Sequence, residues 1–274
     1  MVAPPTRCIF CNGVPLNEEH VLGKWSKRFV PRTMPNYKQL QAIQHATQSD
    51  FKVRHRAGDP RSLKVTCVCF KCNSGWMNAI QDAMKPYGIA MALGKTIKLD
   101  PKAQLAIATW SAMVTMTAEY DHPFTVAVPQ GDKDFFYKNK YPPPSFRIWI
   151  GHLPPEEKWA NWARHPFAIK EEEDATPGGA LAHLNSVTST HVLGQFFVHI
   201  LSCPDPGILH RWHLPISVAG CLIQIWPLIH GDIFSPPLRR LTTETASITA
   251  AAFFDFLVRS RRLSRIKQGL DPNG

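Results

Sequence analysis

The sequence has no long hydrophobic run. No window approaches the roughly 18 uninterrupted apolar residues that a membrane-spanning helix needs. The first residues, MVAPPTRC, also lack the apolar stretch of a secretory signal peptide. We therefore expect no membrane partner and a cytoplasmic location. The sequence also has no internal repeat and no low-complexity tract.

Charged residues make up only 19% of the 274 residues, whereas hydrophobic residues make up 44%. This balance excludes intrinsic disorder on composition alone, because enough apolar surface is available for a core of ordinary size. The length suits one large domain or two small ones.

The positive charge is concentrated near the N-terminus. The formal net charge is +10. Residues 1–100 hold 15 lysine and arginine residues against 6 acidic residues, whereas residues 101–274 hold 16 against 15. A basic segment attracts polyanions such as nucleic acid. The alternative is a solvated basic face with no specific partner.

Apolar periodicity predicts a mixture of helices and strands. A helix is expected from Gly75 to Met84, with Pro86 ending it. The other expected elements are a strand pair, Phe51–Arg56 with Ser62–Cys67; strands over Ser145–Gly151, His191–Leu201 and Cys221–Trp226; and helices over Lys102–Glu119 and Thr243–Leu263. Because charge and cysteine content change near residue 100, we expect an α+β protein with an N-terminal module over residues 1–95 and a mixed helix-and-strand domain over residues 96–274.

Five of the seven cysteines fall within the first 72 residues. In a reducing compartment such a cluster indicates metal ligands or free thiols rather than disulfides. Cys8 and Cys11 form one CxxC unit, and Cys69 and Cys72 form another. Each unit can place two thiolates on one tight turn, a knuckle, so two knuckles complete a tetrahedral zinc shell. Four thiolates leave no open position, so the zinc is expected to be structural.

Two alternatives to this ligand set follow from the same residues. Cys67 lies two residues before Cys69, so a register that uses Cys67 would also give four thiolates. We prefer Cys69 and Cys72 because their spacing repeats that of the first knuckle. The alternative to a zinc site is that the two CxxC pairs occur by chance and share no ion, or that they are redox motifs.

Three further residues stand beside the knuckles. Glu19 and His20 follow the first knuckle, and Asn73 directly follows the second. A carboxylate and an amide carbonyl suit a hard cation such as Mg²⁺, and a neutral histidine can take a proton from water. Together with basic side chains, these groups suit phosphodiester hydrolysis. Asn73 could instead cap the helix that is expected to follow it.

These residues resemble the zinc-bearing HNH endonucleases, also called ββα-metal or His-Me finger nucleases. The similarity is carried by CIFC, EEHV, CFKCN and the following GWM, within about residues 8–85. The most similar subgroup has two CxxC knuckles, an acidic–His pair between them and an asparagine directly after the last cysteine. The chain departs from the family pattern at three positions: Glu19 replaces the commoner aspartate, Gly23 replaces a common proline, and Gln81 replaces a common glutamate.

The resemblance implies a role for each matching residue. The four cysteines would hold structural Zn²⁺, His20 would be the general base, and Glu19 and Asn73 would ligate a catalytic Mg²⁺ or Mn²⁺. The implied fold is a treble-clef zinc module with a ββα-metal core. The implied function is a divalent-metal-dependent endonuclease that acts on DNA, with RNA as a second substrate class. The alternative is a non-catalytic, zinc-stabilised module that binds nucleic acid or protein.

Basic residues near the knuckles are candidates for phosphate contacts. The main candidates are Lys24, Lys27, Arg28, Arg54, Arg56 and Lys71. Arg32, Arg61 and Lys64 are further candidates. Residues 96–274 carry no comparable motif. The histidines between His165 and His213 alternate with apolar residues, so we expect core or surface histidines rather than a second metal site.

Overall fold

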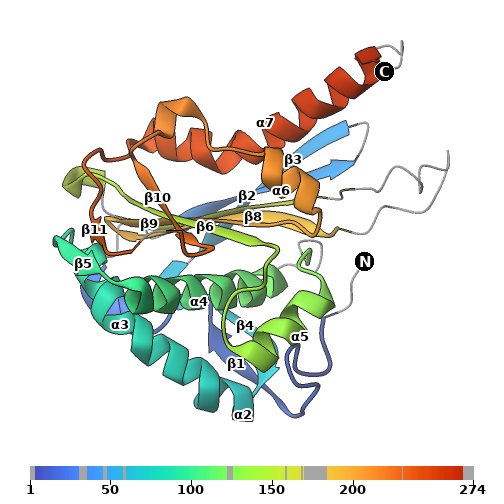
Figure 1. Cartoon of the computed structure of the whole chain (residues 1–274). Helices are drawn as coiled ribbons and strands as arrows, with labels where there is room; N and C mark the ends of the chain where they lie inside the picture. The colour runs from blue at the N-terminus through green and yellow to red at the C-terminus, as the bar shows by residue number, and fades with distance from the viewer. Residues whose placement is uncertain are drawn as a thin grey trace.

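The computed structural model describes residues 4–30, 36–45, 48–57, 60–121, 126–157, 159–167, 169, 184–229 and 231–267. Of the predicted features, Arg32 lies outside the described residues, and the side chains of Arg54 and Arg56 lie outside them as well. The protein is mixed α and β, with helices packed on antiparallel sheets, as the sequence predicted (Figure 1).

The described strands and helices follow one another along the chain. The strands are β1 Leu16–His20, β2 Asn36–His45, β3 Gln48–Ala57, β4 Lys64–Cys69, β5 Ile97–Leu99, β6 Phe146–His152, β7 Trp159–Phe167, β8 Ser186–Gly194, β9 Phe196–Ser202, β10 Leu222–Trp226 and β11 Ile233–Ser235. The helices are α1 Ser26–Phe29, α2 Phe70–Cys72, α3 Asn78–Ala92, α4 Pro101–Ala118, α5 Gln130–Asn139, α6 Pro206–Arg211 and α7 Thr243–Lys267.

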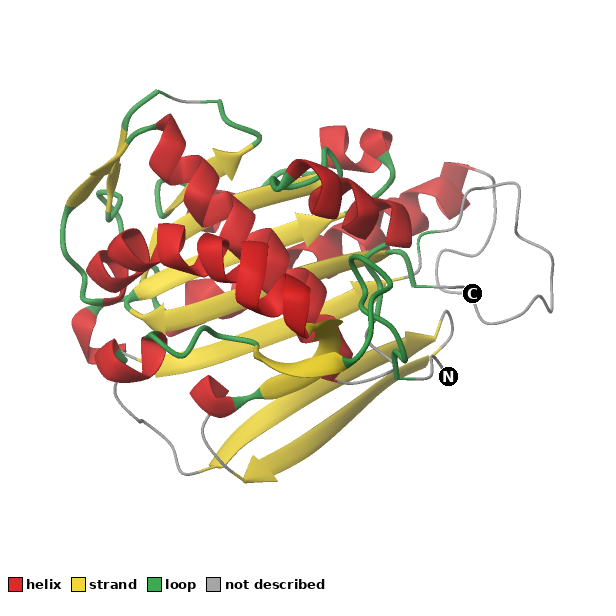
Figure 2. Ribbon diagram, turned by 90° about the horizontal axis from the view of Figure 1, so that it is seen from below, coloured by secondary structure: helices red, strands yellow, loops and turns green. Residues whose placement is uncertain are grey.

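A five-stranded antiparallel sheet forms the centre, in the order β10-β6-β9-β8-β7. Every residue of β8 and β9 is buried, because helices cover both faces of the sheet. Helix α4 lies on one face, and α6 and α7 lie on the other (Figure 1). Figure 2 looks onto the α4 side and shows the β2–β3 ribbon beside the edge strand β7.

Helix α4 is the central helix of the molecule. Asp100 caps its N-terminus by accepting a hydrogen bond of 2.7 Å from the amide of Ala103, and Pro101 occupies the first turn. Nearly all of its side chains are buried. Its buried hydroxyl groups are satisfied within the helix: Ser111 donates to the carbonyl of Ile107, and Thr115 donates to that of Ser111. A helix buried on all sides is what a position between a sheet and a second layer requires.

The N-terminal elements form the layer beneath α4. Strands β1 and β4 pair antiparallel, with a register shift between Asn17 and Glu18. The segment between them contains α1 and the β2–β3 ribbon. After β4 the chain continues through α2, a π turn over Asn73–Met77 and α3. The long separation of the two CxxC units therefore corresponds to a folded insertion, as predicted.

The hydrophobic core is continuous across residue 95. One buried cluster contains Val68 of β4 and Met91 of α3 together with Ile107 of α4 and Ile150 of β6. The elements that carry the cysteines and the central sheet therefore pack on the same buried side chains.

Two predictions about the N-terminal elements are wrong. Pro86 lies inside α3, which continues to Ala92. The proline removes one hydrogen bond of the helix, but buried side chains on either side, such as Met84 and Met91, hold the helix against the core. The predicted strands Phe51–Arg56 and Ser62–Cys67 do not pair with each other, because β3 pairs with β2 and β4 pairs with β1.

The predicted strand His191–Leu201 is two strands. Gly194 ends β8 with a φ of 59°, and a side chain there would lie 2.4 Å from the carbonyl oxygen of Ala92. Only glycine accepts both the left-handed backbone and the close approach. The chain turns back at this point, so His191 and His199 lie on neighbouring strands rather than on one.

Candidate metal centre and active site

Cys8, Cys11, Cys69 and Cys72 converge at one point. Their four Sγ atoms lie within 4.8 Å of one another, and the Sγ atoms of Cys11 and Cys69 are 3.4 Å apart. A tetrahedral zinc with Zn–S bonds of about 2.3 Å places its sulfur atoms about 3.8 Å apart. The donor set and its spacing therefore fit a structural zinc ion. Within the described residues, these cysteines are also the one group of three or more possible ligands that is close enough to share an ion.

The first knuckle is a tight turn of the backbone. The amide of Cys8 donates to the carbonyl of Gly13 at 3.0 Å, and the amide of Asn12 donates to the carbonyl of Cys8 at 2.9 Å. Asn12 adopts a φ of 56°, which asparagine tolerates better than most residues. The amide of Gly13 then points at the Sγ of Cys11, 3.4 Å away.

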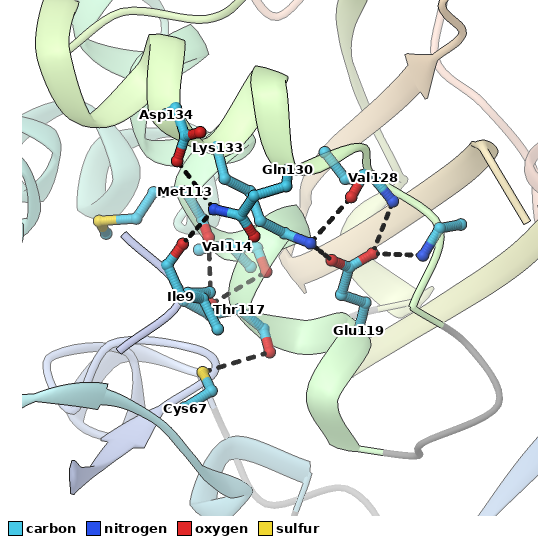
Figure 3. A network of polar contacts seen from close by, with 11 residues as sticks. Ile9, Cys67, Met113, Val114, Thr117, Glu119, Val128, Gln130, Lys133 and Asp134 are labelled. Atoms are coloured by element: carbon cyan, nitrogen blue, oxygen red, sulfur yellow. Dashed lines mark hydrogen bonds and ion pairs between the residues drawn. The ribbon is translucent and has the colours of Figure 1, made fainter. Parts of the chain in front are cut away.

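Cys67 is not part of the thiol group. It lies in β4, fully buried, and its Sγ approaches the carbonyl oxygen of Thr117 on α4 at 4.0 Å (Figure 3). Its own carbonyl accepts a hydrogen bond of 3.0 Å from the amide of Ile9 in the first knuckle. Cys69 and Cys72, the preferred pair, are therefore the cysteines that converge with the first knuckle, and Cys67 is a packing residue that ties the knuckle to β4.

Helix α5 closes the layer around the cysteines. Gln130 donates to the carbonyl of Ile9 at 2.9 Å (Figure 3). The ring of Trp76 lies 5.0 Å from that of Phe10 and 5.8 Å from that of Phe136. Trp76 therefore packs between the first knuckle and α5. Lys140 places its ammonium group 4.4 Å from the Trp76 ring, and burial lowers the pKa of Lys140.

A cleft of about 910 Å³ opens beside the cysteines. Glu19 and His20, the last residues of β1, line one part of it, and Asn73, directly after the second knuckle, lines another. The β1–β4 pairing brings these positions together, because β4 leads straight into the second knuckle. The three predicted side chains therefore share one cleft.

Glu19 is buried, with 9% of its surface exposed, and lines this cleft. Hydrogen bonding by the side-chain amides of Gln81 and Asn73 lowers the pKa of its carboxyl group. Burial nevertheless raises the pKa of Glu19 to about 7, since these bonds and the charge of Lys24 offset only part of the desolvation. A desolvated carboxyl group facing a polar cleft suits a cation that would stabilise its charged form.

His20 is also buried, next to Glu19. Its Nδ1 has no hydrogen-bond partner within the described part of the chain. Burial and the positive charges of Lys27, Lys24 and Lys64 lower the pKa of His20. The imidazole is therefore neutral near pH 7 and able to accept a proton.

Asn73 joins the second knuckle to β1. Its Nδ2 donates to the main-chain carbonyl of Glu18 at 3.0 Å, which identifies the nitrogen of the amide. The residue lies at the start of the π turn, and no side-chain cap is found at the N-terminus of α3. The interpretation of Asn73 as a helix N-cap is therefore wrong.

Several of the predicted phosphate-contact residues line the cleft. They are Lys24, Arg28 and Lys64, the last paired with Glu18 at 2.6 Å. Lys27 and Lys71 are exposed but lie outside the cleft lining. Arg61 is buried and donates to the carbonyls of Val30 and Lys27, so its interpretation as a phosphate contact is wrong.

Sequence reasoning missed the contribution of α3 to the cleft. Asn78, Gln81, Lys85 and Ile89 all line it. These residues are spaced by three and four positions, so they lie along one face of the helix. This spacing could have indicated that these residues share one face of a helix. It was overlooked because the apolar residues on the opposite face dominate the hydrophobic pattern of the segment.

The C-terminal histidines have structural partners. On β8, His191 contacts the hydroxyl of Ser189 at 3.1 Å. On β9, His199 contacts the hydroxyl of Thr190 at 2.8 Å. Burial lowers the pKa of both imidazoles, which keeps them neutral inside the sheet layer.

Comparison with protein-family models, curated proteins and solved structures finds no match for this chain. None of the helices in the described part of the chain is long and apolar enough to cross a membrane.

Proposed function

We propose that the chain is a divalent-metal-dependent HNH endonuclease that hydrolyses phosphodiester bonds of DNA. The observation that supports this most strongly is the shared cleft, in which Glu19, His20 and Asn73 lie beside four converging thiols. In this proposal β1, β4 and α3 are the ββα-metal core of a treble-clef module over residues 1–95, and residues 96–274 pack on that module through the shared core.

Zinc has a structural role in the proposal. The four cysteines leave no ligand position for water or substrate. Zinc held by them would join the first knuckle to the end of β4. Because Asn73 follows the second knuckle directly, this link fixes the distance between Asn73 and the β1 residues Glu19 and His20.

His20 is the general base in the proposed reaction. It takes a proton from a water molecule, which then attacks phosphorus opposite the leaving 3′ oxygen. A bound Mg²⁺ or Mn²⁺ would neutralise charge on the phosphate and on the leaving oxygen. Glu19 supplies a carboxylate oxygen to hold this ion. Asn73 would supply its carbonyl oxygen, which requires rotation of the amide because Nδ2 now faces the carbonyl of Glu18.

Basic side chains around the cleft hold the nucleic acid. Lys24, Arg28, Lys64 and Lys85 line it, and each can contact a phosphate group. These residues come from β4, α3 and the α1 region, so they surround the Glu19–His20 pair on several sides. The concentration of positive charge in the N-terminal third of the chain agrees with this arrangement.

The test is cleavage of supercoiled plasmid by zinc-loaded protein in Mg²⁺ or Mn²⁺. We expect the wild type to nick or cut the plasmid and His20→Ala to lose about 10²–10⁴-fold in rate, the usual contribution of a general base. His210→Ala is the matched control, since His210 is an exposed histidine on α6, outside the cleft. Its rate should equal that of the wild type.

Two results would contradict the proposal. Equal rates for the wild type and His20→Ala would remove His20 from the chemistry. Absence of cleavage by the wild type, with DNA still retained, would leave a non-catalytic zinc-stabilised binding module. Preferential cleavage of RNA in competition with duplex DNA would change the substrate class and keep the mechanism.

A further inference from the structure

Gln81 of α3 lies between two tryptophan side chains. Its Oε1 accepts a hydrogen bond of 3.1 Å from the indole nitrogen of Trp25 and one of 3.0 Å from that of Trp110. An indole N–H can only donate. The two contacts therefore identify the oxygen of the Gln81 amide and fix the orientation of the whole group.

The nitrogen of the same amide is left for Glu19. Gln81 is 8% exposed and lines the same cleft as Glu19, and its amide lowers the pKa of the Glu19 carboxyl group. Because both indoles occupy Oε1, the group that Gln81 can offer to Glu19 is Nε2. The direction of this N–H donor is set by two aromatic residues.

Two glycines make room for this arrangement. A Cβ atom at Gly23 would lie 2.4 Å from Oε1 of Gln81 and 2.6 Å from the indole nitrogen of Trp25. A Cβ atom at Gly88 would lie 2.5 Å from the far edge of the Trp25 ring. Real side chains do not approach this closely, so both positions need glycine for Trp25 to reach Gln81.

We propose that Gln81 is a positioning residue that holds the carboxylate of Glu19 toward the divalent ion, and that Trp110 extends this support to α4. The inference rests on the proposed function of the cleft. An amide suits this place better than a carboxyl group, because a second carboxylate against Glu19 would repel it or share its proton.

The size of the expected effect follows from other metal sites. Outer hydrogen-bond partners of metal ligands typically change metal affinity by about 10–100-fold when they are removed. Trp110 is the more selective probe, because it is completely buried on α4 and does not line the cleft. Its contacts toward the cleft are the hydrogen bond to Gln81 and the packing of its ring against that of Trp25.

The experiment measures Mn²⁺ binding to zinc-loaded full-length protein, from the electron paramagnetic resonance signal of free Mn²⁺. Gln81→Met keeps the length of the side chain and removes both hydrogen-bonding groups, so we expect at least about 10-fold weaker Mn²⁺ binding. Trp110→Phe removes one of the two donors, and we expect a smaller but measurable loss of affinity. Gln104→Met is the matched control: Gln104 is a buried glutamine on α4 that donates to the carbonyls of Leu99 and Gly231. It should lower the melting temperature and leave the Mn²⁺ affinity unchanged.

The outcomes separate the two proposals. If the wild type binds Mn²⁺ and both Gln81→Met and Trp110→Phe bind it equally well, the positioning role is overturned and the cleft keeps its ion. If Gln81→Met fails to fold, Trp110→Phe alone decides, and an unchanged affinity overturns the inference. If the zinc-loaded wild type binds no Mn²⁺, both the proposed function and the inference are contradicted.

Discussion

At Gly13 the first knuckle has little room for a side chain. A Cβ atom there would lie 3.1 Å from the Sγ of Cys11 and 3.4 Å from that of Cys69. The amide of the same residue also points at Cys11. Sulfur atoms held by a metal cannot move aside as a free side chain would. The absence of a side chain at residue 13 is therefore part of the thiol geometry.

Gly13→Ala should weaken zinc binding by about 10-fold or more and destabilise the protein by about 1–3 kcal/mol through crowding. Gly131→Ala is the matched control, because a Cβ atom at Gly131 of α5 would meet nothing within 4 Å. Zinc competition with a chromophoric chelator measures the first effect, and chemical denaturation measures the second. Equal zinc affinity in the wild type and Gly13→Ala would contradict this prediction, because it would show that the first knuckle accommodates a methyl group at residue 13.

Single residues of the site were predictable where chemistry restricts the residue type. Thiolates in repeated CxxC spacing identified the four cysteines, because few other patterns place four sulfur atoms on two turns. The orientation of the Gln81 amide was not predictable. It depends on Trp25 and Trp110, which are distant in sequence and join Gln81 only in the folded molecule.

Strand β4 carries two neighbouring cysteines with different surroundings. Cys69 ends the strand and faces the other thiols, whereas Cys67 is buried against α4. Burial raises the pKa of the Cys67 thiol, which disfavours the thiolate that a metal needs. The strand thus supplies one member of the thiol group and one packing residue.

We expect Cys69→Ser to lose zinc and to unfold β1, β4 and the knuckles, because structural zinc typically contributes about 10–16 kcal/mol to folding. Cys67→Ala should retain one zinc ion per chain. Elemental analysis of the purified proteins gives the zinc content, and amide hydrogen exchange follows the strands. Zinc retained by Cys69→Ser, or lost from Cys67→Ala, would contradict the ligand set.

Elements were predictable from sequence to different degrees. Helix α4 and strands β6 and β10 lie within about a residue of the expected bounds, because long apolar segments bounded by polar residues leave few alternatives. Strand β1 was not expected, since its sequence LNEEH is polar. It forms because β4 supplies its hydrogen-bond partners.

At the scale of the whole molecule, an ion pair joins α5 to the end of α4. Lys133 and Glu119 lie 2.6 Å apart, with exposed side-chain fractions of 2% and 1% (Figure 3). Glu119 also accepts from the amides of Ala127 and Val128, and Lys133 donates to the carbonyl of Val128. Helix α5 in turn contacts the first knuckle through Gln130. The pair therefore connects the sheet layer to the cysteine layer.

Lys133→Met should destabilise the protein by about 3–5 kcal/mol, because it removes one partner of a buried ion pair, the ammonium group 2.6 Å from the Glu119 carboxylate. Lys98→Met is the control: Lys98 also lies 2.6 Å from a carboxylate, that of Asp232, but both side chains are largely exposed. Its removal should change stability little. Urea unfolding compares the two variants. A similar small effect for both would mean that Lys133 is not needed in the core.

The central claim is that one cleft holds a divalent ion next to a zinc-bound group of four cysteines. Anomalous diffraction from crystals of the zinc-loaded protein soaked in Mn²⁺ tests it most directly. We expect a zinc peak about 2.3 Å from the Sγ atoms of all four cysteines and a manganese peak about 2.1 Å from a carboxylate oxygen of Glu19. A manganese peak elsewhere, or none in the cleft, would contradict the account.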